Sequence, residues 1–207
     1  MNLRKKQQEN TRKAILEALG EQIAELGTMG FSIQDVADRA GVTHRTVYNY
    51  FPTREALNDA FAVHVEEELA TLFGVRPDEG VRLAQFPSMA ATFYRSIPAK
   101  AAHVRAYAML MIASRCPAQI TRERTKQFEQ LLEDDAGPLP EGAARLATAA
   151  VRFFVSSIGW HLLTEHQGLS NEDAARTAEW AVQVLLDAVQ SGNLPSSETT
   201  NESRHDD

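Results

Sequence analysis

Two short helical segments joined by a tight turn lie within residues 32–51, and they constrain the fold more than any other feature. Ser32 is placed to cap a helix whose apolar side chains recur at helical spacing, and Gly41 ends it. Thr43 is placed to cap a second, very short helix that runs to about Tyr50. A glycine-containing turn of this length lets the second helix cross the first.

The outward face of the second short helix carries donors, acceptors and aromatic rings, but no acidic residue. Its members are Thr43, His44, Arg45, Thr46, Tyr48, Asn49 and Tyr50. A solvated helix face ordinarily carries Glu and Lys, so this composition is typical of a surface that meets phosphates. We therefore predict that the helix reads double-stranded DNA, with the alternative that Tyr48 belongs in part to the core.

The charge distribution separates a basic N-terminal arm from an acidic remainder. The whole chain has 21 Lys and Arg against 28 Asp and Glu, a formal net charge of −7. Residues 4–13 contain one acidic residue, Glu9, and the basic residues Arg4, Lys5, Lys6, Arg12 and Lys13. This asymmetry favours an anionic partner at one end of the molecule, although an ordinary solvated arm has the same composition.

Together with Gly30-Phe31 before it and residues 51–57 after it, this stretch resembles the DNA-binding head of the tetracycline-repressor (TetR) family. The resemblance covers about residues 9–57, a quarter of the chain. It rests on the pattern Ser-x-x-x-x-Ala-x-x-Ala-Gly-Val, then Tyr-x-Tyr-Phe, then a basic-x-x-Leu helix. The resemblance implies a transcriptional regulator, most often a repressor, that acts on a palindromic operator and is not an enzyme.

The resemblance also implies DNA contacts for Ser32, Thr43, His44, Arg45, Thr46, Tyr48, Asn49, Tyr50 and Arg54. Ser32 and Thr43 match hydroxyls that contact phosphates, and Tyr48 matches a ring against the backbone or a thymine methyl. Arg45 reaches base edges or nearby phosphates, and a guanine contact would provide about 1–3 kcal/mol of discrimination. Arg54 stands where the family usually has lysine, and would hold a phosphate at the N-terminus of the fourth helix.

The rest of the sequence predicts an all-α protein with about nine helices. Pro and Gly cluster between helical segments, and no alternating β-branched run indicates a sheet. We expect a three-helix head at 1–56, a helical ligand-binding and dimerisation body at 57–190, and a disordered polar tail at 191–207. The first helix is expected to start after a cap at Asn10, and a long helix is expected over about 142–166.

The last two expected helices carry long apolar stripes with many small residues, which favours pairing of two chains. The stripes consist of Leu146, Ala150, Phe153, Ser157 and Trp160, and of Ala178, Ala181, Leu185 and Val189. The resemblance implies the same homodimer, whose symmetry would match a pseudo-palindromic operator. The alternative is that both stripes pack within one chain.

Met and aromatic side chains gather in the middle of the body, a composition that suits a pocket for an apolar or aromatic effector. The candidates are Met89, Phe93, Tyr94, His103, Tyr107, Met111, Phe154 and Trp160. The same spacing is also typical of plain core, and His103 of a satisfied core histidine. The identity of this small-molecule effector is not readable from the sequence.

No motif indicates catalysis, a cofactor or a metal, so none is expected. His161 and Glu165 share a helix face with His166 adjacent, but no second such pair accompanies them, and Cys116 is a single cysteine. With no membrane-spanning run or secretory signal, we expect a cytoplasmic protein. Two alternatives stay open: a DNA-binding regulator without a small-molecule ligand, and a helical enzyme or metal-binding protein.

Overall fold

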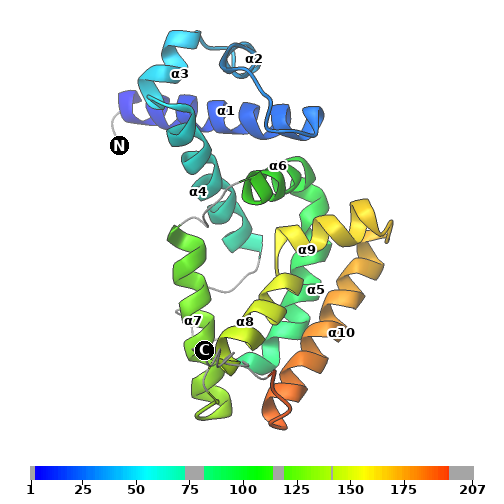
Figure 1. Cartoon of the computed structure of the whole chain (residues 1–207). Helices are drawn as coiled ribbons and strands as arrows, with labels where there is room; N and C mark the ends of the chain where they lie inside the picture. The colour runs from blue at the N-terminus through cyan, green and yellow to red at the C-terminus, as the bar shows by residue number, and fades with distance from the viewer. Residues whose placement is uncertain (1–2, 73–81, 114–118, 141, 196–207) are drawn as a thin grey trace, which may run out of the picture.

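The computed structural model describes residues 3–72, 82–113, 119–140 and 142–195, and their regular structure is entirely helical. The head comprises α1 (Leu3–Leu26), α2 (Ile33–Arg39) and α3 (His44–Tyr50). Helix α4 (Arg54–Leu72) leads from the head down into the body, as Figure 1 shows. The all-α prediction is therefore confirmed.

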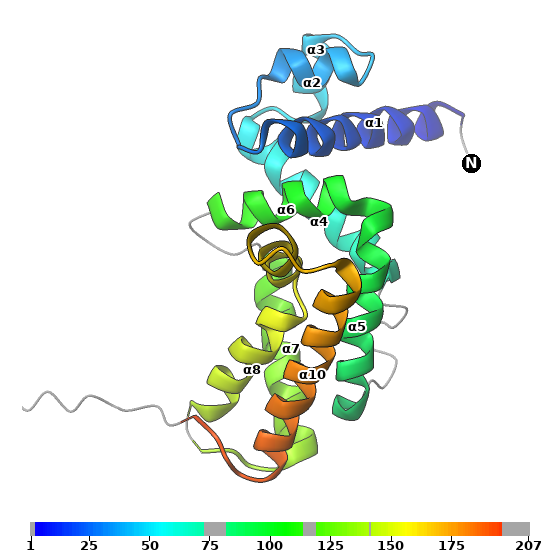
Figure 2. The ribbon, with the colours of Figure 1, turned by 90° about the vertical axis from the view of Figure 1, so that its right-hand side faces the viewer.

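The body surrounds the lower end of α4 with six further α-helices. They are α5 (Phe86–Ser96), α6 (Ala101–Ala113), α7 (Gln119–Ala136), α8 (Ala143–Phe154), α9 (Ser157–His161) and α10 (Asn171–Gln190). Short segments η2 (Leu83–Gln85), η3 (Ile97–Lys100) and the π-helical η4 (Leu162–His166) adjoin them. Helix α10 packs along α5, whereas α1 crosses α6 (Figures 1 and 2).

The expected domain limits remain predictions, because α4 belongs to both parts. Residue 57 lies in its first turns, and its later turns pack in the body. Most of the tail expected at 191–207 lies outside the described residues, which end at 195.

Side-chain caps fix the starts of the three helices that follow α1. The hydroxyls of Ser32, Thr43 and Thr53 each accept a hydrogen bond from the backbone N–H three residues on, at 3.0, 3.1 and 3.0 Å. Such a cap typically stabilises a helix by about 1 kcal/mol. The capped starts expected from the sequence are thus observed.

The turn between α2 and α3 closes around a left-handed glycine. Gly41 has φ of 66°, which glycine adopts without a steric penalty. The backbone N–H of Val42 reaches back to the carbonyl of Ala37 at 3.0 Å, and that of Gly41 to Asp38 at 3.2 Å. These bonds satisfy carbonyls at the end of α2 and turn the chain sharply into α3.

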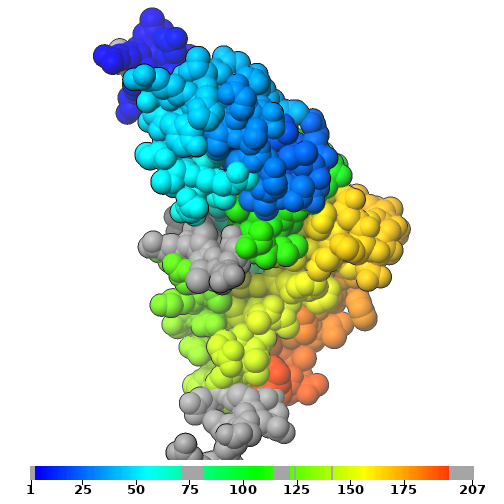
Figure 3. All heavy atoms as spheres, turned by 45° about the horizontal axis from the view of Figure 1, so that its top comes forward, coloured from blue at the N-terminus to red at the C-terminus, as the bar shows by residue number. Residues whose placement is uncertain are grey.

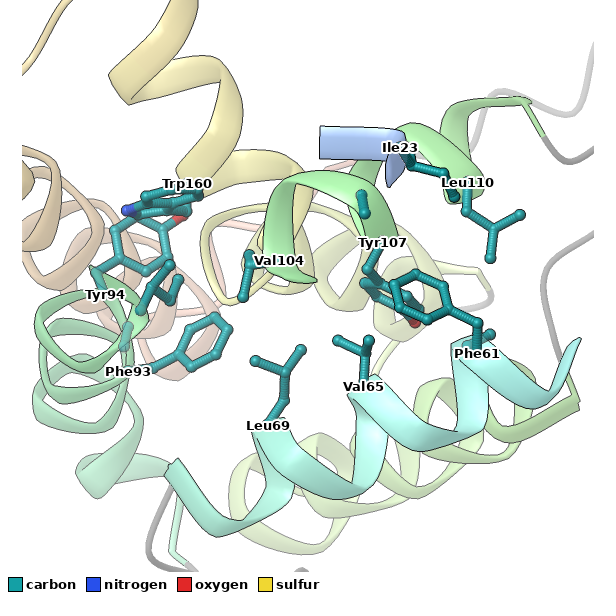
Figure 4. Packing of buried hydrophobic residues seen from close by; sticks show 14 of the residues in the cluster. Ile23, Phe61, Val65, Leu69, Phe93, Tyr94, Val104, Tyr107, Leu110 and Trp160 are labelled. Atoms are coloured by element: carbon teal, nitrogen blue, oxygen red, sulfur yellow. The ribbon is translucent and has the colours of Figure 1, made fainter. Parts of the chain in front are cut away.

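One continuous apolar core runs from the head into the body. In α1, Ile15, Leu16, Leu19 and Ile23 are fully buried, and Val47 anchors α3. Figure 4 shows Phe61, Val65 and Leu69 of α4 pointing toward the side chains of α5 and α6. Since each fully buried side chain of this size contributes about 1.5–3 kcal/mol, α4 is held firmly at both ends.

The first helix begins earlier than expected, at Leu3 instead of after Asn10. Residues 3–10 are exposed, and Figure 3 shows this end of α1 projecting beyond the rest of the head. The segment contains Lys, Gln, Glu and Arg, which favour helix, and no Gly or Pro to interrupt it. The basic arm is therefore an extension of α1.

The long helix expected over 142–166 is interrupted, and this expectation was wrong. Helix α8 ends at Phe154, and the next segment leaves at 48°. The hydroxyl of Ser156 donates to the carbonyl of Phe153 at 2.7 Å and accepts from the N–H of Gly159 at 3.0 Å, starting α9. A Cβ on Gly159 would lie 2.2 Å from the Phe153 carbonyl oxygen and 2.7 Å from the Tyr94 hydroxyl.

Within the described ranges, no single helix combines the length and apolar composition needed to cross a membrane. In those same ranges one bent pair, α8 with the segment Ser157–His166, passes that test by length and composition alone.

Replacing Gly159 by alanine is expected to destabilise the protein, because the new methyl group meets a backbone oxygen that cannot move aside alone. Overpacking of this kind costs about 1–3 kcal/mol. Urea unfolding followed by circular dichroism measures the change. Gly30→Ala is the control, because its Cβ would find no atom closer than 3.7 Å. Equal stability of the two variants would contradict the tight packing at α9.

Candidate DNA interface and effector pocket

Helix α3 presents its polar face to solvent while a single buried side chain, Val47, holds it down. Exposed on it and its cap are Thr43, His44, Arg45, Tyr48 and Asn49, with Thr46 and Tyr50 half-buried. Tyr48 is 42% exposed, so its ring is available at the surface rather than part of the core. All the residues predicted on this face therefore lie together on one short helix.

Neighbouring side chains order this face. The rings of His44 and Tyr48 meet edge to face with centroids 4.8 Å apart. The hydroxyls of Thr43 and Thr46 lie 2.8 Å from each other. Arg45 makes no hydrogen bond or ion pair within the described part of the chain, which leaves its guanidinium available to an external acceptor.

Two further predicted DNA contacts flank α3. Ser32 is exposed at the start of α2. Arg54, at the start of α4, turns inward: its Nη2 donates to the carbonyl of Met29 at 2.6 Å, and its guanidinium lies 3.7 Å from the centroid of the Phe31 ring. Arg54 thus joins α4 to the loop after α1, and its phosphate contact remains a prediction.

A network of polar contacts fastens α2 to α1. The guanidinium of Arg39 donates to Glu25 at 2.8 Å, and to Glu21 and Gln22 at 3.2 Å each. The Arg12 guanidinium of α1 lies 5.6 Å from the ring centroid of Phe51, the residue that follows α3. These contacts join α2, and the end of α3, to the long helix α1.

The body contains a cavity of about 840 Å³ that extends from α4 to α9. Four of the predicted ligand residues line it, Met89 and Phe93 from α5 and Tyr107 and Met111 from α6. The structure therefore brings half of the predicted set to one site.

The other four candidates, Tyr94, His103, Phe154 and Trp160, do not line this cavity. Tyr94 is fully buried, and burial raises the pKa of its hydroxyl. The indole N–H of Trp160 donates to Asn171 at 2.8 Å, joining α9 to α10. His103 faces Glu68 of α4 instead, with its Nδ1 2.9 Å from the carboxylate.

A buried carboxylate is the main cavity residue that the sequence analysis missed. Glu66 is 5% exposed, lines the cavity and accepts a hydrogen bond from the Tyr107 hydroxyl. It lies in the acidic run 66–68, which resembles a solvated helix face. Its spacing gives the available signal, because Glu66 precedes the buried Leu69 by three residues and therefore shares its helix face.

Apolar side chains from α5, α7 and α8 complete the wall and were also missed. They include Phe86, Phe128, Leu131 and Phe153. The rings of Phe86 and Phe128 meet edge to face at 4.8 Å, which holds α7 against α5. Arg152 adds a charged group to the lining. The cavity is thus largely apolar, with a few polar groups.

A capped helix–turn–helix head, joined by one long helix to an all-α body with a cavity, defines the fold class of a transcriptional regulator. Residues 15–61 match the sequence model for "bacterial regulatory proteins, tetR family". This segment of the chain therefore matches the TetR family, as its sequence pattern predicted. The matched model describes regulatory proteins, which supports the expectation of a regulator rather than an enzyme.

Solved structures share this fold over most of their length. A TetR-family regulator from Rhodococcus sp. aligns with a TM-score of 0.67 and 19% identity, covering 86% of this chain and 99% of the other. One from Marinobacter aquaeolei VT8 gives 0.64 and 17%, covering 89% and 97%. NalD of Pseudomonas aeruginosa, the secondary repressor of the MexAB-OprM multidrug efflux pump, gives 0.58 and 21%, covering 91% and 98%. No curated protein matches by sequence.

Proposed function

We propose that the chain is a cytoplasmic, homodimeric repressor that binds a palindromic operator and is released from it by a small apolar or aromatic ligand. The observation that carries the DNA-binding part is the face of α3. It lies inside the matched segment 15–61, carries no acidic residue, and exposes Arg45 next to His44, whose ring packs on that of Tyr48. Such a helix offers hydrogen bonds to base edges while its neighbours contact phosphates.

The proposed dimer uses a different side of α10 from the one the stripe indicated. Ala178, Ala181 and Val189 are buried against the chain's own helices. Trp180 and Val184, one turn apart, are 68% and 48% exposed. A large apolar side chain exposed in this way favours an interface, so we assign pairing to the face that carries these two residues.

The cavity supports release by a ligand. Its volume lies within the range of small-molecule sites, and its lining is mainly apolar. Glu66 and Leu69 contribute to it from α4, the same helix whose N-terminal end carries the head. A ligand that contacts α4 differently in two arrangements of the heads shifts their populations by that difference in affinity. This cavity favours an effector-controlled regulator over one without a ligand.

NalD, which shares the fold, is described as a repressor of a multidrug efflux pump. That description supports the repressor part of the proposal.

Arg45→Ala is expected to relax operator specificity, because the proposed base contact is lost. Selection of duplexes from a random pool should return an inverted repeat with the unchanged protein. The variant should bind the best sequence about 5–150-fold more weakly, corresponding to about 1–3 kcal/mol. Lys126→Ala, which removes an equal charge from exposed α7, should leave binding unchanged. Failure of the unchanged protein to enrich any repeat would overturn the DNA-binding proposal.

Trp180→Glu is expected to convert the dimer into a monomer, because it places a charge in the apolar interface. Sedimentation equilibrium measures the mass, and operator affinity should fall with it because two heads no longer bind together. Ile112→Glu is the matched control, since Ile112 is also exposed, at 62%, but lies on α6. A dimer that survives the first substitution would place the interface elsewhere.

Met89→Trp is expected to fill the cavity and uncouple the repressor from its ligand. The probe is the apolar dye N-phenylnaphthylamine, with a panel of small aromatic compounds tested for operator release. The variant should no longer bind the dye, and no compound should release it from the operator, whereas its operator affinity should be unchanged. Met109→Trp, a half-buried methionine outside the cavity, should behave like the unchanged protein. The ligand proposal fails if both variants bind the dye equally, or if no compound changes operator affinity.

A further inference from the structure

Three metal-ligating side chains meet where α4 packs against α6. His64 and Glu68 lie one turn apart on α4, and His103 comes from α6. One ligand atom from each lies within 4.8 Å of the others. Nδ1 of His103 is 2.9 Å from one oxygen of Glu68, and Nε2 of His64 is 3.9 Å from the other.

The environment keeps one of these imidazoles neutral. The side chain of His64 is 12% exposed, and its Nε2 is buried without a hydrogen-bond partner within the described structure. Burial lowers the pKa of His64, although the Glu68 carboxylate opposes that effect. The cluster therefore contains a buried imidazole nitrogen, 3.9 Å from a carboxylate, that forms no hydrogen bond within the described structure.

The carboxylate of Glu68 is held in its charged form. Burial alone would raise its pKa, but hydrogen bonds from Lys100 and His103 lower it overall. Nζ of Lys100 lies 2.8 Å from Glu68, and the Lys100 side chain is 40% exposed. An ammonium group on a flexible stem therefore supplies the positive charge here, and it can swing into solvent when another cation takes its place.

We propose that His64, Glu68 and His103 form a binding site for a divalent transition-metal ion of the zinc type. Two imidazoles and one carboxylate are donors that zinc prefers, whereas calcium and magnesium prefer oxygen alone. Water would complete the coordination, and Lys100 would move away. None of the three residues lines the effector cavity, so this site is separate from it.

The position of the site connects it to the head. An ion held by two ligands on α4 and one on α6 would tie the head-bearing helix to the body. Helix α1 lies directly over it, because a Cβ on Gly20 would come within 2.8 Å of the His103 ring. Resting on the proposed function, we infer that metal and operator change each other's affinity by the same factor.

Cobalt binding to the full-length protein tests the site, because four-coordinate Co²⁺ has intense visible absorption bands, whereas the hydrated ion absorbs only weakly. We expect saturation at one ion per chain and displacement by Zn²⁺. Glu68→Gln and His64→Gln should each weaken binding by about 100-fold or more, since even the loss of an outer partner costs about 10–100-fold. His166→Gln, an exposed histidine outside the cluster, should have no effect.

Thermal unfolding provides a second readout and shows whether the variants fold. Zn²⁺ should raise the melting temperature of the unchanged protein and of His166→Gln, but not of Glu68→Gln. Absence of a saturable site, or equal binding by the ligand variants, would overturn the metal site. If metal binds but operator affinity is unchanged, only the coupling is overturned. If the protein binds no operator with or without metal, the proposed function is wrong. The cobalt spectrum then still shows whether the metal site exists.

Discussion

The contact between α1 and α6 at Gly20 is the constraint on which the relation of head to body depends. A side chain there would lie 2.8 Å from both Phe61 of α4 and His103 of α6, so the helices approach as closely as they do only because glycine has none. The apolar core then runs through this contact without a gap. Any signal that passes from the body to the DNA-binding face has to move helices that are packed at this distance.

The head was predictable from the sequence because its structure depends on local interactions. The caps at Ser32 and Thr43 and the glycine turn each involve residues within five positions, and the apolar spacing of α2 shows its buried face. The break after α8 combines the local Ser156 cap with a distant contact. Gly159 packs against Tyr94, which is far away in the sequence, and no spacing pattern within the helix reveals that neighbour.

The cavity illustrates the same difference. Composition predicted an apolar pocket rich in Met and aromatic rings, and Met89, Phe93, Tyr107 and Met111 do line it. Composition does not determine which ring faces the cavity and which faces another helix, so Trp160 was assigned to the pocket although it packs between α9 and α10. The sequence analysis did not assign Glu66 to the cavity, because its acidic neighbours are typical of an exposed helix face. Tertiary packing nevertheless buries its side chain.

The inward turn of Arg54 affects how the protein responds to ionic strength. Each phosphate that a cation neutralises releases condensed counterions, so affinity falls with salt in proportion to the number of such contacts. A guanidinium already engaged by a backbone carbonyl and the Phe31 ring contributes less to that number than a lysine free at the same position. If the chain binds an operator as proposed, the salt sensitivity of that binding would rest mainly on Arg45 and on the basic first turns of α1. The early start of the first helix at Leu3, which carries Arg4, Lys5 and Lys6, would then matter more for that sensitivity than the charge at the start of α4.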